Sequence, residues 1–183
     1  MGKQLINFFT LIRINQWIKN AFVFLPIFFD QQFTNPSALL NGSIAFLSFS
    51  LIASAIYCFN DYIDVEFDKN HPEKKNRPIA SGAVTKKQAI VYVLLLLLSS
   101  VCISYGFNST ALTYVILIYF GLNILYTLLL KNIIVLDVIT IALSFVLRIV
   151  AGGVAASIIL SHWIIIMVFL LALFLALAKR RDE

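Results

Sequence analysis

The strongest constraint on this chain is its series of long apolar stretches, several of which approach or exceed the ~20 residues that an α-helix needs to cross a bilayer. Hydrophobic residues make up 61% of the 183 residues, charged residues only 13%, and the mean hydropathy is +0.92. With this composition a soluble domain would leave too much apolar surface in water. The sequence therefore predicts an all-α integral membrane protein, a polytopic helical bundle forming one domain over residues 1–183.

Six candidate spans follow one another along the chain. We expect them at about 18–33, 38–59, 89–107, 110–130, 133–155 and 158–178. The first is the weakest, because Pro26 lies inside it and an amphipathic segment beginning at Leu5 precedes it. The opening residues include Lys3, Arg13 and Lys19 but no small-residue cleavage site, so we expect no signal peptide.

The basic residues predict the orientation of the spans. Every Lys and Arg except Arg148 lies near one set of span ends, whereas the linkers 30–41, 106–110 and 155–162 contain neither residue. By the positive-inside rule, both termini and the charged loop after the second span are cytoplasmic, in a multi-pass protein of the inner cell membrane. The net charge of +5 then reflects topology, and we expect no nucleic-acid partner.

An acidic pattern follows the second span in the stretch "YCFNDYIDVEFDKNHPEKKNRPIASG", residues 57–82. Asn60, Asp61, Asp64 and Asp68 form N-D-x-x-D-x-x-x-D, and spacings of three and four place side chains on one helix face. Aligned carboxylates near a membrane are costly without a cation among them, and Mg²⁺ prefers such oxygen ligands. The alternative is a solvated acidic loop. An EF-hand fits poorly, because the central glycine is absent.

Basic residues come next and complete a candidate phosphate site: His71, Lys74, Lys75 and Arg77. Arg77 stands beside Pro78 in "RPIASG", where Pro78 and Gly82 predict a turn that would fix it, whereas the two lysines could equally be positive-inside residues. Thr85 and Gln88 predict a capping box at the start of the third span.

These motifs together resemble a known family. "NQWIKN", "NDYIDVEFD", "RPIASG" and "YTLLLKN" occur in the order typical of the UbiA superfamily of membrane prenyltransferases, and the resemblance covers the whole chain. "DKNHPEKKNRPIASG", "LRIVAGGVA" and "LAKRRDE" are similar to the branch of decaprenyl-phosphate phosphoribosyltransferases.

The resemblance implies about nine spans around a cavity open to the cytoplasm, with two acidic motifs that hold Mg²⁺ and a diphosphate. In this branch 5-phosphoribose passes from phosphoribosyl diphosphate to a polyprenyl (decaprenyl) phosphate, and diphosphate is released. The second acidic motif follows the sixth span, where this sequence stops at "KRRDE". We therefore expect a chain that is truncated relative to the family, and the activity of the chain alone stays open, as does its oligomeric state.

The candidate site residues follow from the motifs and the resemblance. The residues expected to hold the metal and the diphosphate are Asn60, Asp61, Asp64 and Asp68. The catalytic residues are expected to be Asp61, Asp64, Asp68 and Arg77. Phosphate binding is assigned to Arg77 and Lys131, with Lys19 and Lys74 as weaker candidates. Tyr126 either lines the cavity or is an interfacial anchor.

Four further residues lie in or beside the later spans. Asp137 is expected in the pocket, about one and a half turns into the fifth span. Arg148 would lie ~25 Å from Lys131 along a helix, so we expect it to snorkel or to pair structurally. His162 and Trp163 are interpreted as interfacial anchors.

Two other functions remain open. A UbiA-type transfer of a prenyl group from a polyprenyl diphosphate to an aromatic acceptor uses the same aspartates, although the His71-Pro72 element argues against it. An inactive truncated membrane protein, a scaffold or a piece of a transporter is the non-enzymatic alternative. Transporters usually place ionisable residues at the membrane midplane, whereas here they cluster at a helix end.

Overall fold

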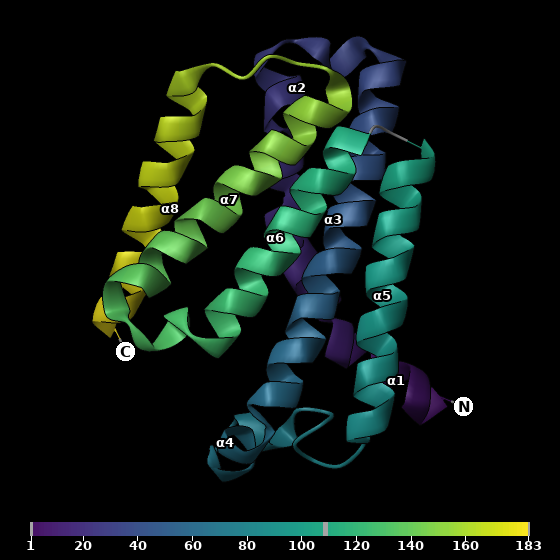
Figure 1. Ribbon diagram of the computed structural model, residues 1–183, viewed down its shortest axis with the longest axis vertical. Helices are drawn as coiled ribbons and strands as arrows, with labels where there is room; N and C mark the ends of the chain where they lie inside the picture. The colour runs from purple at the N-terminus through teal and green to yellow at the C-terminus, as the bar shows by residue number, and fades with distance from the viewer. Residues whose placement is uncertain (1, 108–109, 183) are drawn as a thin grey trace.

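The computed structural model describes residues 2–107 and 110–182, and within those ranges it consists of helices and their connections without a β-strand (Figure 1). The predicted all-α membrane class is confirmed. Five of the described helices are long and apolar enough to cross a membrane: α3 (Pro36–Ile63), α5 (Lys86–Phe107), α6 (Thr110–Leu128), α7 (Ile134–Ala156) and α8 (His162–Asp182).

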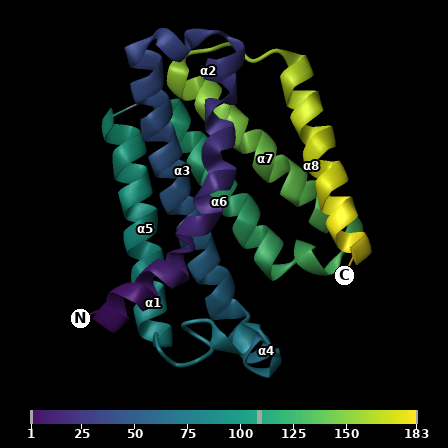
Figure 2. The ribbon, with the colours of Figure 1, turned by 180° about the vertical axis from the view of Figure 1, so that it is seen from behind.

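The first predicted span, 18–33, is not a continuous α-helix. The chain begins with α1 (Gly2–Ile12), continues as the 3₁₀ helix η1 (Ile14–Phe24), and ends in α2 (Leu25–Phe29) and the short η2 (Gln32–Thr34). Arg13 breaks the helix because its backbone is left-handed, with φ 51° and ψ 54°. Pro26 then stands in the first turn of α2, where proline is tolerated. The segment still runs along the bundle from α1 to α2 (Figure 2).

Small polar residues on α3 let η1 pack closely against it. Ser50 and Ser54 are four residues apart and so face the same side of α3. Asn20 donates to the Ser50 hydroxyl at 3.0 Å, the Trp17 indole donates to Ser54 Oγ at 2.9 Å, and Ser54 donates to the carbonyl of Ile12 at 2.8 Å. Small side chains at such contacts are a common basis for helix packing in membranes.

A buried arginine ties η1 to the later spans. Arg148, on α7, is 4% exposed and donates to Asn20 Oδ1 at 2.9 Å, to the Ser144 carbonyl at 2.6 Å and to the Tyr119 hydroxyl at 3.1 Å. Its guanidinium also lies over three rings: Phe145, Phe49 and Tyr119. Arg148 was expected either to snorkel to the membrane surface or to pair structurally. Structural pairing is correct and snorkelling is wrong, since these partners hold the charge inside the bundle.

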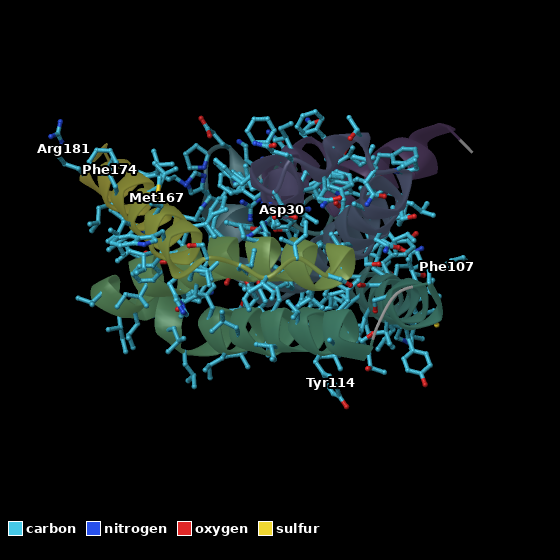
Figure 3. All side chains as sticks on the ribbon, turned by 90° about the horizontal axis from the view of Figure 1, so that it is seen from above. Asp30, Phe107, Tyr114, Met167, Phe174 and Arg181 are labelled. Carbon is cyan, nitrogen blue, oxygen red and sulfur yellow. The ribbon has the colours of Figure 1, made fainter. Side chains whose placement is uncertain are left out.

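Many large apolar side chains are exposed along the outside of the long helices. Phe107 and Tyr114 point away from the helices in the view from above (Figure 3), as lipid-facing side chains do. A groove of about 830 Å³ lies between α2 and the first half of α8, and Trp163 and Met167 are among its lining residues. His162 is exposed at the start of α8.

The charged connection between α3 and α5 contains α4 (Val65–Asn70) and η3 (Lys74–Asn76). The predicted turn after Arg77 is present: the Val84 amide donates to the Pro78 carbonyl at 2.8 Å, and Gly82 adopts φ +78°. The predicted capping box is also present. The Thr85 amide donates to Gln88 Oε1 at 2.9 Å, and the Gln88 amide donates to Thr85 Oγ1 at 3.3 Å.

Candidate active site

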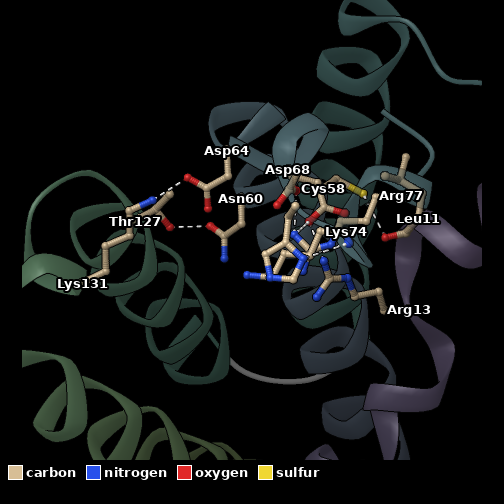
Figure 4. A network of polar contacts seen from close by, with 12 residues as sticks. Leu11, Arg13, Cys58, Asn60, Asp64, Asp68, Lys74, Arg77, Thr127 and Lys131 are labelled. Atoms are coloured by element: carbon tan, nitrogen blue, oxygen red, sulfur yellow. Dashed lines mark hydrogen bonds and ion pairs between the residues drawn. The ribbon is translucent and has the colours of Figure 1, made fainter. Parts of the chain in front are cut away.

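The aspartates of the acidic motif lie where α3 ends and α4 begins (Figure 4). Asn60 and Asp61 are in the last turn of α3, Asp64 joins the two helices, and Asp68 is on α4. The predicted single helix is interrupted at Asp64, so the three carboxylates do not lie on one continuous helix. Because α3 ends at Ile63, Asp64 pairs with a different part of the molecule from Asp61 and Asp68.

Two arginines hold the inner pair of aspartates. Asp61 is 2% exposed and Asp68 is 3% exposed. Arg77 donates from one nitrogen to Asp61 Oδ1 at 3.1 Å and to Asp68 Oδ2 at 2.7 Å. Arg13 Nη2 reaches the same Asp61 oxygen at 2.5 Å. Charged hydrogen bonds of this kind offset the cost of burying carboxylates at the end of a membrane span.

A lysine from the far end of α6 holds the outer aspartate. Lys131, in η4 (Leu130–Asn132), lies 2.5 Å from Asp64 Oδ1, and both side chains are about 30% exposed. In the last turn of α6, Thr127 donates its hydroxyl to the Asn60 amide oxygen. The ends of α3 and α6 are thus joined at two points, and the partly exposed pair borders the solvent at this end of the bundle.

Another buried aspartate, Asp137 on α7, has its own polar partners. Asp137 is 1% exposed and accepts from the Tyr126 hydroxyl at 2.7 Å and from Arg180 Nε at 2.6 Å. Arg180 belongs to the last turn of α8, so the contact ties the end of α8 to the start of α7. Tyr126 therefore has a polar partner inside the protein, which an interfacial anchor alone does not need.

The two weaker phosphate candidates stay outside the cluster. Lys19 is exposed on η1, and Lys74 is exposed on η3. Among the described residues neither makes an ion pair with the aspartates. His71 has a structural contact instead: its Nδ1 accepts from the backbone amides of Glu73 and Lys74 at 3.2 and 3.3 Å, which shapes the basic loop.

Sequence reasoning missed three partners in these networks. Arg13 and Asp61 are 48 residues apart, and Thr127 and Asn60 are 67 apart, so no local spacing connects them. The one usable signal for Arg13 was its place two residues before "NQWIKN", at the charged end of the first apolar segment. Arg180 lies in "KRRDE", and its partner Asp137 is 43 residues away, so the local sequence gives no sign of the pair.

The acidic motif offers oxygen atoms from Asn60, Asp61, Asp64 and Asp68 to a metal ion. Within the described ranges, no group of three His, Cys, Asp or Glu side chains is close enough to hold a metal by itself. Mg²⁺ usually takes only one or two protein carboxylates and completes its shell with phosphate oxygens and water. The aspartates and the Asn60 amide oxygen therefore fit a Mg²⁺ ion that binds together with a phosphate ligand, once it displaces the basic side chains.

The fold and this acidic and basic site define a family of membrane transferases. The chain belongs to the UbiA prenyltransferase family, whose model matches residues 22–182. It is 36% identical over 176 residues to the decaprenyl-phosphate phosphoribosyltransferase of Mycolicibacterium smegmatis, and 38% identical over 176 residues to that of Corynebacterium glutamicum. Each match covers 94% of this chain but 55% and 53% of the relative, so the chain spans about half the length of these proteins.

A solved structure shares the fold. The UbiA homolog from Archaeoglobus fulgidus bound to DMAPP and Mg²⁺ superposes with a TM-score of 0.79 at 20% sequence identity. The match covers 91% of this chain and 60% of that one. The helices described above therefore have the arrangement of that membrane bundle.

Proposed function

We propose that this chain carries the diphosphate site of a Mg²⁺-dependent transferase. The proposed transferase moves 5-phosphoribose from phosphoribosyl diphosphate to a polyprenyl phosphate and releases diphosphate. The observation that carries the proposal is the cluster at the end of α3, where buried and half-buried aspartates are each paired with a side chain that suits a phosphate. The two relatives named decaprenyl-phosphate phosphoribosyltransferase and the His71-Pro72 element favour this donor and acceptor.

The site is proposed to face the cytoplasm at the inner membrane. Both chain ends lie in the half of the molecule that contains α4 (Figure 1), in agreement with the positive-inside prediction for the termini and the charged loop. The donor, phosphoribosyl diphosphate, is water-soluble, whereas the acceptor is a lipid. A site at the end of membrane spans gives access to both.

The residues divide between metal and phosphate. Asn60, Asp61, Asp64 and Asp68 would hold Mg²⁺, which, when bound, offsets the negative charge that develops on the leaving diphosphate. Arg77 and Lys131, released from their aspartates, bind diphosphate oxygens. Lys74 and Lys19 are expected to add long-range attraction, and Tyr126 to line the site beside Asp137.

The acceptor needs little activation. A phosphate monoester is already anionic, and one of its oxygens forms the new bond to ribose C1 while the bond from C1 to the diphosphate oxygen breaks. Positive character builds on the ribose ring in between, and the electron pair of the broken bond leaves with the diphosphate. No strong general base is required, which agrees with a sequence that has two histidines, of which His71 is engaged with backbone amides.

A second function has support from the shared fold. A homolog with the same helix arrangement was solved with DMAPP and Mg²⁺, and a prenyl diphosphate presents the same diphosphate to the same kind of site. Transfer of a prenyl group to an aromatic acceptor is therefore the alternative for this chain.

A two-donor assay on membranes containing the chain separates these functions. One reaction contains labelled phosphoribosyl diphosphate and a polyprenyl phosphate; the other contains a labelled prenyl diphosphate and an aromatic acid. Each is run with Mg²⁺ and with EDTA. We expect a labelled phosphoribosyl lipid with Mg²⁺ only. Label in the aromatic product would favour the alternative, and no product in either reaction would contradict the proposal for this chain.

A further inference from the structure

We propose that Arg13 is a further diphosphate-binding residue, which neutralises Asp61 in the substrate-free protein and passes to a diphosphate oxygen once Mg²⁺ occupies Asp61. The inference rests on the proposed diphosphate site but not on which organic group is transferred.

Charge balance supports this exchange. Arg13 and Arg77 are both in contact with Asp61 Oδ1, and Arg77 also contacts Asp68, so two guanidinium groups balance two buried carboxylates. Mg²⁺ brings two further positive charges to the carboxylates. If it bound while both guanidinium groups stayed in place, the cluster would carry an excess of positive charge. A diphosphate is the anion that removes this excess and offers oxygens to both arginines.

The backbone of Arg13 is fixed in a conformation that aims its side chain at α3. The left-handed φ of 51° is unfavourable for a residue with a Cβ, yet it turns the chain so that Arg13 faces Asp61. Ser54 holds the preceding carbonyl of Ile12 at 2.8 Å. The guanidinium lies 5.1 Å from the centre of the Tyr57 ring, a contact that a cation keeps while its hydrogen bonds change.

The side chain is partly open to solvent. Arg13 is 28% exposed, compared with 2% for Asp61. A guanidinium at the rim of the cluster, on a fixed backbone, can exchange one anionic partner for another without a helix moving. Arg77 has the same exposure and contacts the same Asp61 oxygen, but it comes from the turn after η3, whereas Arg13 comes from the junction of α1 and η1. Two guanidinium groups from separate elements thus meet at one carboxylate oxygen, where both can turn to a diphosphate that binds beside Asp61.

If Arg13 exchanges Asp61 for diphosphate, the variant Arg13→Gln should bind the metal more tightly and diphosphate more weakly. In Arg13→Gln, Mg²⁺ no longer competes with Arg13 for Asp61, so the metal alone should bind several-fold more tightly. Inorganic diphosphate at saturating metal should bind roughly 10- to 100-fold more weakly, because a charged hydrogen bond is lost. A purely structural role for Arg13 would weaken both.

The test measures both affinities on the purified full chain in detergent. Mn²⁺ is the metal probe, and its binding is monitored by EPR. Inorganic diphosphate is the anion probe. Arg181→Gln is the matched control, since Arg181 is exposed and points away from the bundle (Figure 3), and we expect neither affinity to change more than about twofold. Arg13→Lys keeps the charge and should recover part of the diphosphate affinity, and it also serves if Arg13→Gln does not fold.

The outcomes separate this inference from the proposed function. Tighter metal binding with weaker diphosphate binding supports the exchange. If both affinities of the Arg13 variants fall, or neither changes, Arg13 has no such role, while the proposed function stands. If the unaltered chain binds no diphosphate in the presence of metal, the proposed function and this inference both fail.

Discussion

At Gly152 the backbone of α7 lies directly against the backbone of η1, so Gly152→Ala is a direct test of how the N-terminal segment is packed. A Cβ at this position would lie 1.8 Å from the Val23 carbonyl oxygen and 2.8 Å from the carbonyl carbon. Both are backbone atoms and cannot rotate away. Real Cβ contacts under 3.0 Å essentially never occur, so the two segments must separate by more than about 1 Å.

The cost can be estimated from what this separation disturbs. Overpacking of a tight contact costs about 1–3 kcal/mol. One turn earlier on α7, Arg148 donates to Asn20 at 2.9 Å across the same interface, and weakening this bond adds about 0.6–1.5 kcal/mol. Alanine is the better helix former by about 1 kcal/mol, which offsets part of the loss. We expect Gly152→Ala to lower the free energy of unfolding by about 1–3 kcal/mol.

The assay is reversible unfolding of the purified chain in mixed micelles, followed by circular dichroism. Gly121→Ala is the matched control, because Gly121 lies within α6 and a Cβ there would have no heavy atom within 4 Å. It should be neutral or stabilising by up to about 1 kcal/mol. If Gly152→Ala is as stable as Gly121→Ala, η1 does not lie against α7 as described.

Three further predictions concern the charged end of the molecule. Asp64→Asn should reduce Mg²⁺-dependent transfer by about 100-fold or more while leaving folding intact, measured as product per amount of folded protein. Arg77→Lys should weaken diphosphate binding about tenfold or more in a binding assay, since an ammonium lacks the planar set of donors with which a guanidinium holds two phosphate oxygens at once. The pKa of Glu66 is lowered by its hydrogen bond and charge contact with Lys69 and then by Lys86. This contact should therefore persist above the ordinary pKa of a glutamate and be lost as the pH falls through the lowered value, which a ¹³C NMR titration of Glu66 would show.

Glu66→Gln is a useful control for the Asp64 variant. Glu66 is an exposed acidic residue on α4 whose partners are Lys69 and Lys86, not the aspartate cluster. We expect transfer to stay within about twofold of that of the unaltered chain. A comparable loss in both variants would show that acidic charge near the membrane, rather than the position of Asp64, is what matters.

Features set by local sequence were predictable. The apolar spans follow from composition and length alone, and the start of α5 follows from Thr85 and Gln88, whose side chains and amides bond to each other three residues apart. The turn containing Gly82 is equally local. In each case the residues that determine the structure are neighbours in the chain.

Features that depend on tertiary packing were not predictable in the same way. The aspartate spacing indicated one helix face, but it assumed that α3 continues past Ile63, and Asp64 instead pairs with Lys131. The first span was predicted as one helix, but its polar residues are used in contacts with α3 and α7 that favour a 3₁₀ segment. The contact of Arg13 with Asp61 depends on the left-handed break before η1, so it could not be predicted from a continuous helix.

The most direct test of the diphosphate site is an experimental structure of the chain with Mg²⁺ and inorganic diphosphate. We expect the metal to contact carboxylates of Asp61, Asp64 or Asp68, with Arg77 and Lys131 turned from these aspartates to diphosphate oxygens. If the ion pairs of Asp61, Asp64 and Asp68 stay intact and the diphosphate binds elsewhere, the cluster at the end of α3 is structural and the proposed site is wrong.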